Sequence, residues 1–271
     1  MTQNVLIKTA VWRKRTTVGD WLNYLLWLTG ILLFGWCFQL MTADTIWAFV
    51  SDAPRQAADI TERMLPPAWS STRELLWPLW ETLNIATLGT LLGLIVATPV
   101  AFLAAHNTTP SRWLVRPAAL FITIASRSIN SLIWALLLVA IMGPGPLAGI
   151  FAIAFRSIGF IGKLLYEAIE EVDTAPVEAI ASTGAGFAQT IGWSIVPQIA
   201  PTLAGITVFR WDINIRESTV LGLVGAGGIG MKLESALNTL AWPKVAMILI
   251  AILVTVAVSE WISAVARQKL I

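Results

Sequence analysis

Residues 178–197 of the chain read EAIASTGAGFAQTIGWSIVP, a polar segment with long apolar runs on both sides of it. It begins at the acidic Glu178 and closes at Pro197, and it is too polar to cross a bilayer. A short amphipathic segment of this kind, held between two membrane spans on the cytoplasmic side, is well placed to be pushed by a soluble partner. The segment thus predicts a membrane protein whose helices are moved by a separate soluble partner protein.

The residues around this segment predict two short helices. Asp173-Thr174-Ala175-Pro176 is typical of a helix start, because Asp or Thr can cap a helix and Pro suits its first turn. Gly184 is expected to end this first helix, since a positive φ costs glycine least. A second short helix is expected from Phe187 to Pro197.

The composition identifies an integral membrane protein. Of 271 residues, 56% are hydrophobic and only 13% are charged, whereas soluble domains carry about 25% charged residues. The formal net charge of +2 is too small to indicate a nucleic-acid partner. A single cysteine, Cys37, and a single histidine, His106, leave no pattern that would support a metalloenzyme.

Six apolar runs predict an all-α fold, because about 20 apolar residues suffice for a helix to cross the hydrocarbon. The expected spans are Trp21–Met41, Thr82–Ala105, Ala118–Ile141, Leu147–Leu165, Pro197–Ile215 and Val245–Val265. The chain is accordingly divided into 1–81 (tail, first span and external segment) and 82–271 (the transmembrane domain, with the loop at about 166–197). Pro66 and Pro67 are expected to interrupt any helix in the external segment.

Basic residues at both ends predict that both termini lie in the cytoplasm. These residues are Lys8, Arg13, Lys14, Arg15, Arg267 and Lys269. Six crossings agree with this, and they place the 166–197 loop inside. The alternative for the first run is a cleaved signal peptide. The run exceeds the usual 7–15 apolar residues of such a peptide and no small-x-small cleavage site follows it, which favours a retained helix.

The 178–197 segment resembles the coupling loop of bacterial ABC importer permeases, with the pattern Glu-Ala-Ala, three residues, Gly, nine residues, Ile-x-Leu-Pro. Four positions are in register: Glu178, Ala179, Gly184 and Pro197. Ser194 and Val196 depart from the pattern. The resemblance implies that the loop seats in a cleft of a cytoplasmic ATPase, with Glu178 meeting a basic residue there. The alternative is a plain amphipathic loop on the membrane surface.

Residues 209–230 read FRWDINIRESTVLGLVGAGGIG. Gly225, Gly227 and Gly230 satisfy the G-x-G-x-x-G spacing of a dinucleotide site, but a membrane span precedes them and no acid follows about 20 residues later. We therefore expect these glycines to serve tight external turns or close helix contacts. The chain also has no G-x-x-x-x-G-K-[ST] phosphate loop, so it is not expected to hydrolyse ATP.

The same block resembles the phosphonate branch of these permeases. The matching positions are Asn214, Arg216, Ser218, Thr219, Val220, Leu221 and Gly222. This resemblance implies a homodimeric inner-membrane permease for phosphonates or reduced-phosphorus oxyanions such as phosphite. It also implies a partner ATPase dimer that binds ATP and Mg, and an external binding protein. Asn130 stands where the family often has a proline, so no proline marks a break in the third span.

Three arginines lie inside expected spans and a fourth lies at the outer end of one; inside a span, each charge costs at least about 2.5–3.5 kcal/mol unless it faces protein or water. They are Arg127, Arg156, Arg210 and Arg216. One hypothesis is that Arg210 and Arg216, with Arg127, line a cationic path for an oxyanion at the dimer interface. Asn214, Ser218 and Thr219 are further candidates for this path.

The alternative for these arginines is structural pairing. Asp212 and Arg216 are spaced i, i+4, Glu217 can neutralise a neighbour, and Arg156 is interpreted as structural. Another class of function, an ion-coupled secondary transporter or channel, would show pseudo-symmetric halves and a midplane carboxylate. Only Glu260 lies deep in a late span. The sequence thus favours a transport subunit that is not itself an enzyme, with no catalytic, metal or cofactor site of its own.

Overall fold

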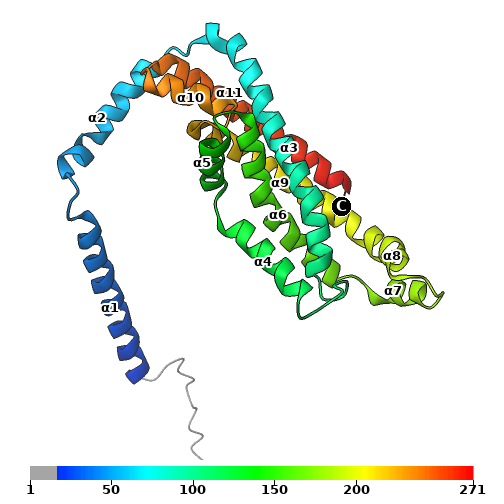
Figure 1. Ribbon diagram of the computed structural model, residues 1–271. Helices are drawn as coiled ribbons and strands as arrows, with labels where there is room; N and C mark the ends of the chain where they lie inside the picture. The colour runs from blue at the N-terminus through cyan, green and yellow to red at the C-terminus, as the bar shows by residue number, and fades with distance from the viewer. Residues whose placement is uncertain (1–16, 271) are drawn as a thin grey trace, which may run out of the picture. The chain divides into compact units, whose positions relative to one another are not determined.

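The computed structural model describes residues 17–270, and within them every regular element is a helix (Figure 1). The basic residues Lys8, Arg13, Lys14 and Arg15, on which part of the predicted orientation rests, lie outside the described residues. The chain divides into two compact units, residues 1–59 and 60–271, which are described separately.

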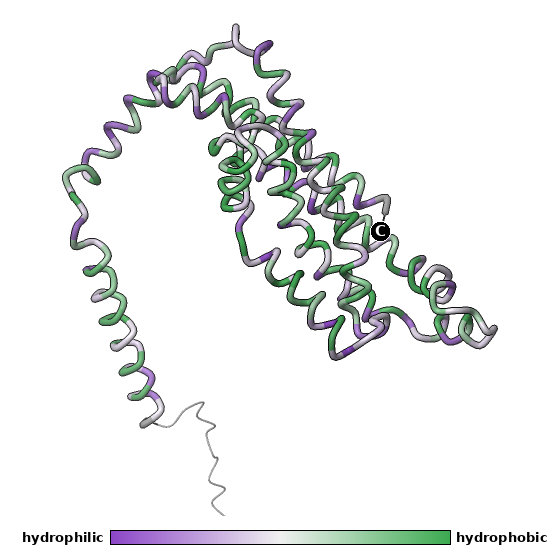
Figure 2. Tube along the Cα trace, in the orientation of Figure 1, coloured by the Kyte–Doolittle hydropathy of each residue, from purple (hydrophilic) through white to green (hydrophobic). Residues whose placement is uncertain are grey.

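The first unit contains α1 (Thr17–Thr42) and most of α2 (Trp47–Met64). Helix α1 is mostly apolar beyond its first turns, as Figure 2 shows, and its Gly19–Thr42 stretch is long and hydrophobic enough to cross a membrane. Its large side chains are exposed, which suits contact with lipid. Helix α2 buries no residue and ends two residues before Pro66, as the prolines predict.

The second unit is a bundle whose elements run as follows: η1 (Trp69–Ser71), α3 (Thr72–Ala104), α4 (Val115–Ser128), α5 (Ser131–Met142), α6 (Pro146–Glu170), α7 (Thr174–Ala181), α8 (Phe187–Thr190), η2 (Ile191–Ile195), α9 (Val196–Leu221), η3 (Gly222–Val224), α10 (Ile229–Asn238) and α11 (Trp242–Leu270). Among the described residues, five helical stretches are long and apolar enough to span a membrane, and the bent pair α4–α5 gives a sixth when its two helices are counted as one span. By length and composition, these stretches correspond to the six predicted apolar runs.

Helix α3 forms the spine of the bundle and packs along α6. Gly89 and Gly93 make the approach possible: a Cβ at Gly89 would lie 2.6 Å from Ile153 Cγ2, and one at Gly93 would lie 2.6 Å from Ser157 Cβ. The helix starts at Thr72, ten residues before the expected start of this span. Its 33 residues reach about 50 Å, far more than the roughly 30 Å of hydrocarbon, so its acidic first turns need not enter the membrane.

The third span is broken at Asn130, where the sequence left a break undecided. Helices α4 and α5 meet at an angle of 88°, although no proline stands at the break. Asn130 is in an extended conformation and its side chain accepts a hydrogen bond from the Leu132 amide at 3.1 Å. Asn130 thus caps the start of α5.

The fifth span also differs from its prediction, because the helical path runs on from Phe187 through α8 and η2 into α9. Residues 191–195 form a π-helical turn, in which the Val196 amide bonds the Ile191 carbonyl. Pro197 follows in the first turn of α9, where its missing N–H is not required. The second short helix of the loop is therefore joined to the span rather than separated from it at Pro197.

The glycine-rich segment after α9 makes both tight turns and a close helix contact. Gly225, Gly227 and Gly228 adopt positive φ angles. At Gly230 a Cβ would lie 2.2 Å from the Thr219 carbonyl oxygen, so α10 abuts the end of α9 there. Helix α10 itself was not predicted, and α11 extends beyond the expected Val245–Val265 span at both ends.

Candidate functional site

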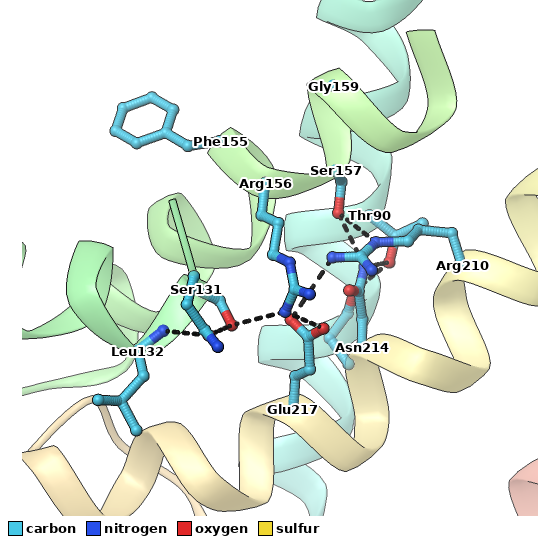
Figure 3. A network of polar contacts seen from close by, with 12 residues as sticks. Thr90, Ser131, Leu132, Phe155, Arg156, Ser157, Gly159, Arg210, Asn214 and Glu217 are labelled. Carbon is cyan, nitrogen blue, oxygen red and sulfur yellow. Dashed lines mark hydrogen bonds and ion pairs between the residues drawn. The ribbon is translucent and has the colours of Figure 1, made fainter. Parts of the chain in front are cut away.

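One face of α9 carries three polar residues into the interior of the bundle: Arg210, Asn214 and Glu217. Their i, i+4, i+7 spacing places them on a single stripe of the helix. The stripe meets Arg156 and Ser157 of α6 and Thr90 of α3 (Figure 3). We call these six residues the interior cluster.

Glu217 is the centre of charge in the cluster. Its Oε1 lies 2.6 Å from Nη1 of Arg156, and its Oε2 lies 3.5 Å from Nη2 of Arg210. Figure 3 shows the two guanidinium groups approaching this carboxylate from different helices. Two cations thus share one anion, and the group keeps one positive charge in excess. An excess cation inside a bundle favours the presence of an anion.

Arg210 is held behind the carboxylate in a fixed position. Its side chain is only 2% exposed. Its Nε donates to Ser157 Oγ at 3.1 Å, and its guanidinium carbon lies 5.0 Å from the centre of the Phe160 ring. A buried charge needs such neighbours, because an unpaired one would cost several kcal/mol. The cation–π contact adds attraction without supplying an anion.

Asn214 is fully buried and its amide group is fixed by two hydroxyls. Its Nδ2 donates to Thr90 Oγ1 at 2.7 Å and to Ser157 Oγ at 3.1 Å. Since Thr90 Oγ1 itself donates to the Ala86 carbonyl, it accepts from the asparagine. The Asn214 Oδ1 atom, by contrast, has no hydrogen-bond partner among the described residues. A buried acceptor left unpaired in this way costs free energy.

The turn of α6 that carries Arg156 and Ser157 is bound by a side chain from α4. The Ser126 hydroxyl donates to the Phe155 carbonyl and accepts a hydrogen bond from the Gly159 amide at 2.9 Å. These two backbone groups stand four residues apart in the continuous helix α6, so one hydroxyl contacts both ends of a single helical turn. The close approach needs Gly159, where a Cβ would lie 2.5 Å from the Thr123 carbonyl oxygen.

The remaining candidates for the substrate path lie outside the interior cluster. Arg216 pairs with Asp212 at 2.5 Å on another face of α9, which is the pairing that the i, i+4 spacing predicted. Asp212 also accepts from Ser259 of α11 at 2.9 Å. Ser218 donates to backbone carbonyls of Ile215 and Thr82, and Thr219 donates to the Arg216 carbonyl.

Arg127 also lies apart from the cluster, exposed near the end of α4. No ion pair involving its guanidinium is found within residues 17–270.

Sequence reasoning singled out Arg210 and Asn214 but treated Arg156 only as a structural residue and did not consider Ser157 or Thr90. The charge of Arg156 inside an apolar run marked it as a residue that needs a partner. Its pairing with Glu217, 61 positions away, leaves no local trace. Hydroxyl residues such as Ser157 and Thr90 are common in membrane helices, which is why they attract no notice in the sequence.

The loop between α6 and α9 contains the two short helices α7 and α8. Asp173 caps α7, accepting from the Ala175 amide at 3.0 Å, and Gly184 follows with a φ of +81°. Glu178 and Ala179 are exposed on α7. Val177, one residue earlier, packs against the core cluster of the neighbouring helix ends. The loop is thus anchored by one apolar side and presents Glu178 outward.

Beside the loop, Glu170 at the end of α6 joins three helices. Its Oε1 lies 3.0 Å from Nδ1 of His106, just after α3, and 3.2 Å from Nη2 of Arg116 in α4. Arg116 Nε also donates to the Ala104 carbonyl at the end of α3. These contacts hold the helix ends from which the loop departs.

The chain is similar to known transport proteins in both sequence and fold. It is 38% identical over 238 residues to a phosphite transport system permease protein of Stutzerimonas stutzeri, covering 88% of this chain and 85% of that protein. It is 40% identical over 236 residues to a phosphate-import permease protein of Mycolicibacterium smegmatis, covering 85% of this chain and 44% of that one.

Among solved structures, the fold matches a chain of the MetNI methionine ABC transporter. The TM-score is 0.65 at 19% identity, over 75% of this chain and 99% of that chain. Such transport permeases leave ATP hydrolysis to a separate subunit and work with a binding protein. Residues 89–271 match the model of one family. The chain belongs to this family, the inner membrane components of binding-protein-dependent transport systems.

Proposed function

We propose that this chain is the permease subunit of an ATP-driven importer of phosphonates or related reduced-phosphorus oxyanions such as phosphite. The observation that carries the proposal is the 38% identity to a phosphite permease over nearly the whole of both chains. The chemistry of the interior cluster supports it, since two guanidinium groups suit an oxyanion.

The assembly that we propose contains two copies of this chain, two cytoplasmic ATPase subunits and one external binding protein. ATP and Mg bind to the ATPases, and this chain needs no cofactor. Both termini face the cytoplasm in this arrangement, as does the loop with α7 and α8. Glu178, Ala179, Gly184 and Pro197 then mark the ATPase contact. Exposure of Glu178 on a short helix anchored by Val177 supports this assignment.

Phosphate is a second candidate substrate, because a relative at 40% identity is named as a phosphate-import permease. Phosphate differs from phosphite by a hydroxyl in place of a hydrogen on phosphorus. The external binding protein is therefore the best place to separate the two. Measuring which oxyanion the cognate binding protein captures, by calorimetry with phosphite, methylphosphonate and phosphate, assigns the cargo.

The transport function is tested by uptake in a strain that lacks its own permease gene. We expect this chain, together with its ATPase and binding protein, to restore growth on phosphite or methylphosphonate as the only phosphorus source. Omission of the ATPase should abolish uptake. Uptake that continues without the ATPase would instead favour the ion-coupled alternative, and failure to import any of the three oxyanions would contradict the proposal.

A further inference from the structure

The interior cluster has the geometry of an anion site that is filled by one of its own side chains. The Glu217 carboxylate offers one oxygen to Arg156 and the other to Arg210. Two oxygens on one phosphorus atom can bridge two guanidinium groups in the same manner. The distances are unequal, 2.6 Å to Arg156 and 3.5 Å to Arg210, so the carboxylate favours the first.

The unpaired Asn214 Oδ1 atom indicates which kind of anion would complete the cluster. The Asn214 Nδ2 and the Arg210 Nε both donate to Ser157 Oγ, so the amide lies directly beside the guanidinium (Figure 3). The buried Oδ1 requires a donor. A singly protonated phosphite or phosphonate carries a P–OH group that can donate there while its other oxygens accept from the arginines. A carboxylate such as that of Glu217 has no such donor.

Burial gives the cluster an open side and a closed side. The Arg156 side chain is 32% exposed and Glu217 is 16% exposed, whereas Arg210 is 2% exposed. An incoming anion therefore meets Arg156 first. The carboxylate can move away from Arg156 while Arg210 keeps its contacts with Ser157 and Phe160. The cluster has one positive charge more than it has negative charges. A monoanion can therefore pair with Arg156 while the Glu217 carboxylate stays paired with Arg210.

We propose that Arg156 and Arg210 form an oxyanion-binding site inside the permease, and that the substrate enters it by displacing Glu217 from Arg156. The proposal rests on the proposed function for the identity of the anion. Glu217 acts as a built-in competitor: it neutralises the arginines when no substrate is present, and its return to Arg156 promotes release. The site is thereby kept weak, as a transport path requires, because tight binding would hold the anion back.

The test is equilibrium binding of phosphite to the purified permease–ATPase complex in phosphatidylcholine nanodiscs, without the binding protein, by titration calorimetry. Glu217→Gln removes the competitor, so we expect it to bind phosphite roughly tenfold more tightly than wild type. Arg156→Gln leaves the buried Arg210 paired with Glu217. We expect this variant to bind phosphite roughly tenfold or more weakly than wild type, because a charge-assisted hydrogen bond to the anion is lost. Lys163→Gln, which removes another glutamate-paired cation of α6, should bind like wild type.

Each outcome bears on the site. Equal binding by wild type, Glu217→Gln and Arg156→Gln in a complex that imports phosphite overturns the site but leaves the proposed function standing. A complex that imports no phosphorus oxyanion overturns the function instead. If Glu217→Gln fails to co-purify with the ATPase, Arg156→Gln decides: unchanged affinity overturns the site. Loss of phosphite binding when phosphatidylglycerol is added identifies a lipid phosphate as the occupant and overturns the substrate assignment.

Discussion

The interior cluster and the loop of residues 171–186 are both polar, yet they are built in opposite ways. In the cluster, Arg210 is almost wholly buried and every charged group contacts another helix of the same chain. In the loop, Glu178 is exposed and most polar contacts are local, such as the cap of α7 by Asp173, although the Asp173 amide also donates to Gln198 of α9 at 3.0 Å. The cluster therefore pairs its charges within the bundle and leaves a single buried acceptor, Asn214 Oδ1, without a partner among the described residues, whereas the loop leaves its polar face exposed for a partner.

This difference predicts where substitutions act. Buried charges and close helix contacts are coupled to the whole bundle, so changing them affects folding as well as transport. Exposed side chains on a short anchored helix contribute little to the bundle, so changing them should affect only what binds there. The variants below separate the two regions, beginning with the largest expected effect.

Overpacking next to the cluster should be the most damaging change. Gly93→Leu places a side chain against Ser157, whose Cβ would lie 2.6 Å from the new Cβ. We expect a loss of about 3 kcal/mol or more in stability and poor recovery of the complex. The control is Gly192→Leu at the end of the loop, where a Cβ meets nothing within 4 Å. Thermal unfolding of both variants in detergent makes the comparison, and equal melting temperatures would contradict it.

Reversing the exposed charge of the loop should uncouple the permease without unfolding it. For Glu178→Arg we expect ATPase binding to weaken by about 2 kcal/mol or more, since the charge pair between Glu178 and a basic residue of the ATPase would be lost. The melting temperature of the permease alone should stay unchanged. Glu171→Arg, also exposed but before α7, is the matched control. The result is measured by co-purification of the ATPase with the permease and by ATP hydrolysis of the complex in the presence of substrate and binding protein. Normal ATPase binding by Glu178→Arg would favour a membrane-surface loop.

The turn between α7 and α8 should tolerate a side chain less well than its neighbour does. Gly184 has a φ of +81°, so Gly184→Ala is expected to cost about 1 kcal/mol locally and to reduce coupling modestly. Gly186 has a φ of −69°, so Gly186→Ala adds no backbone strain and should cost only about 0.5 kcal/mol, because alanine is a poorer N-cap of α8 than glycine. Hydrogen exchange of the loop amides can measure the difference. The reverse order would mean that the turn changes conformation in the complex.

The smallest effect on uptake is expected at Arg216 of α9, outside the interior cluster. Arg216 is 44% exposed, but its partner Asp212 is only 6% exposed, so Arg216→Gln leaves this buried carboxylate with Ser259 as its remaining partner and should cost about 1–3 kcal/mol in stability. Assembly with the ATPase should be preserved. If Arg216 lines the path, uptake falls, but by less than in Arg210→Gln. Unchanged uptake in Arg216→Gln would remove Arg216 from the path and confine the cationic route to the interior cluster.

Much of the membrane topology could be predicted because hydropathy is a local property. Six crossings follow from apolar runs, and the start of α7 follows from Asp173 and Pro176. The start of α3 was misplaced because Glu74 and Glu81 look external even though the helix runs through them. The break at Asn130 stayed undecided because an asparagine cap is a weaker signal than a proline.

The candidate site could be predicted only in part. Charges inside apolar runs mark Arg156 and Arg210 as costly residues that need partners. Which partner each one takes depends on how α3, α6 and α9 pack, and that packing brings together residues as far apart as Thr90 and Asn214. The hydrogen bonds of Ser126 to two backbone groups of α6 likewise have no counterpart in local spacing.

The sequence by itself determined that this is a six-crossing membrane protein with a capped polar loop and a family-typical block around Asn214, because hydropathy, capping and motif spacing act over a few residues. Only the tertiary structure decided that Glu217 forms ion pairs with both Arg156 and Arg210, whereas Arg216 forms its ion pair with Asp212. The reason is physical. A charge in a membrane must find a counter-ion, and close helix packing at glycines decides which one lies within reach.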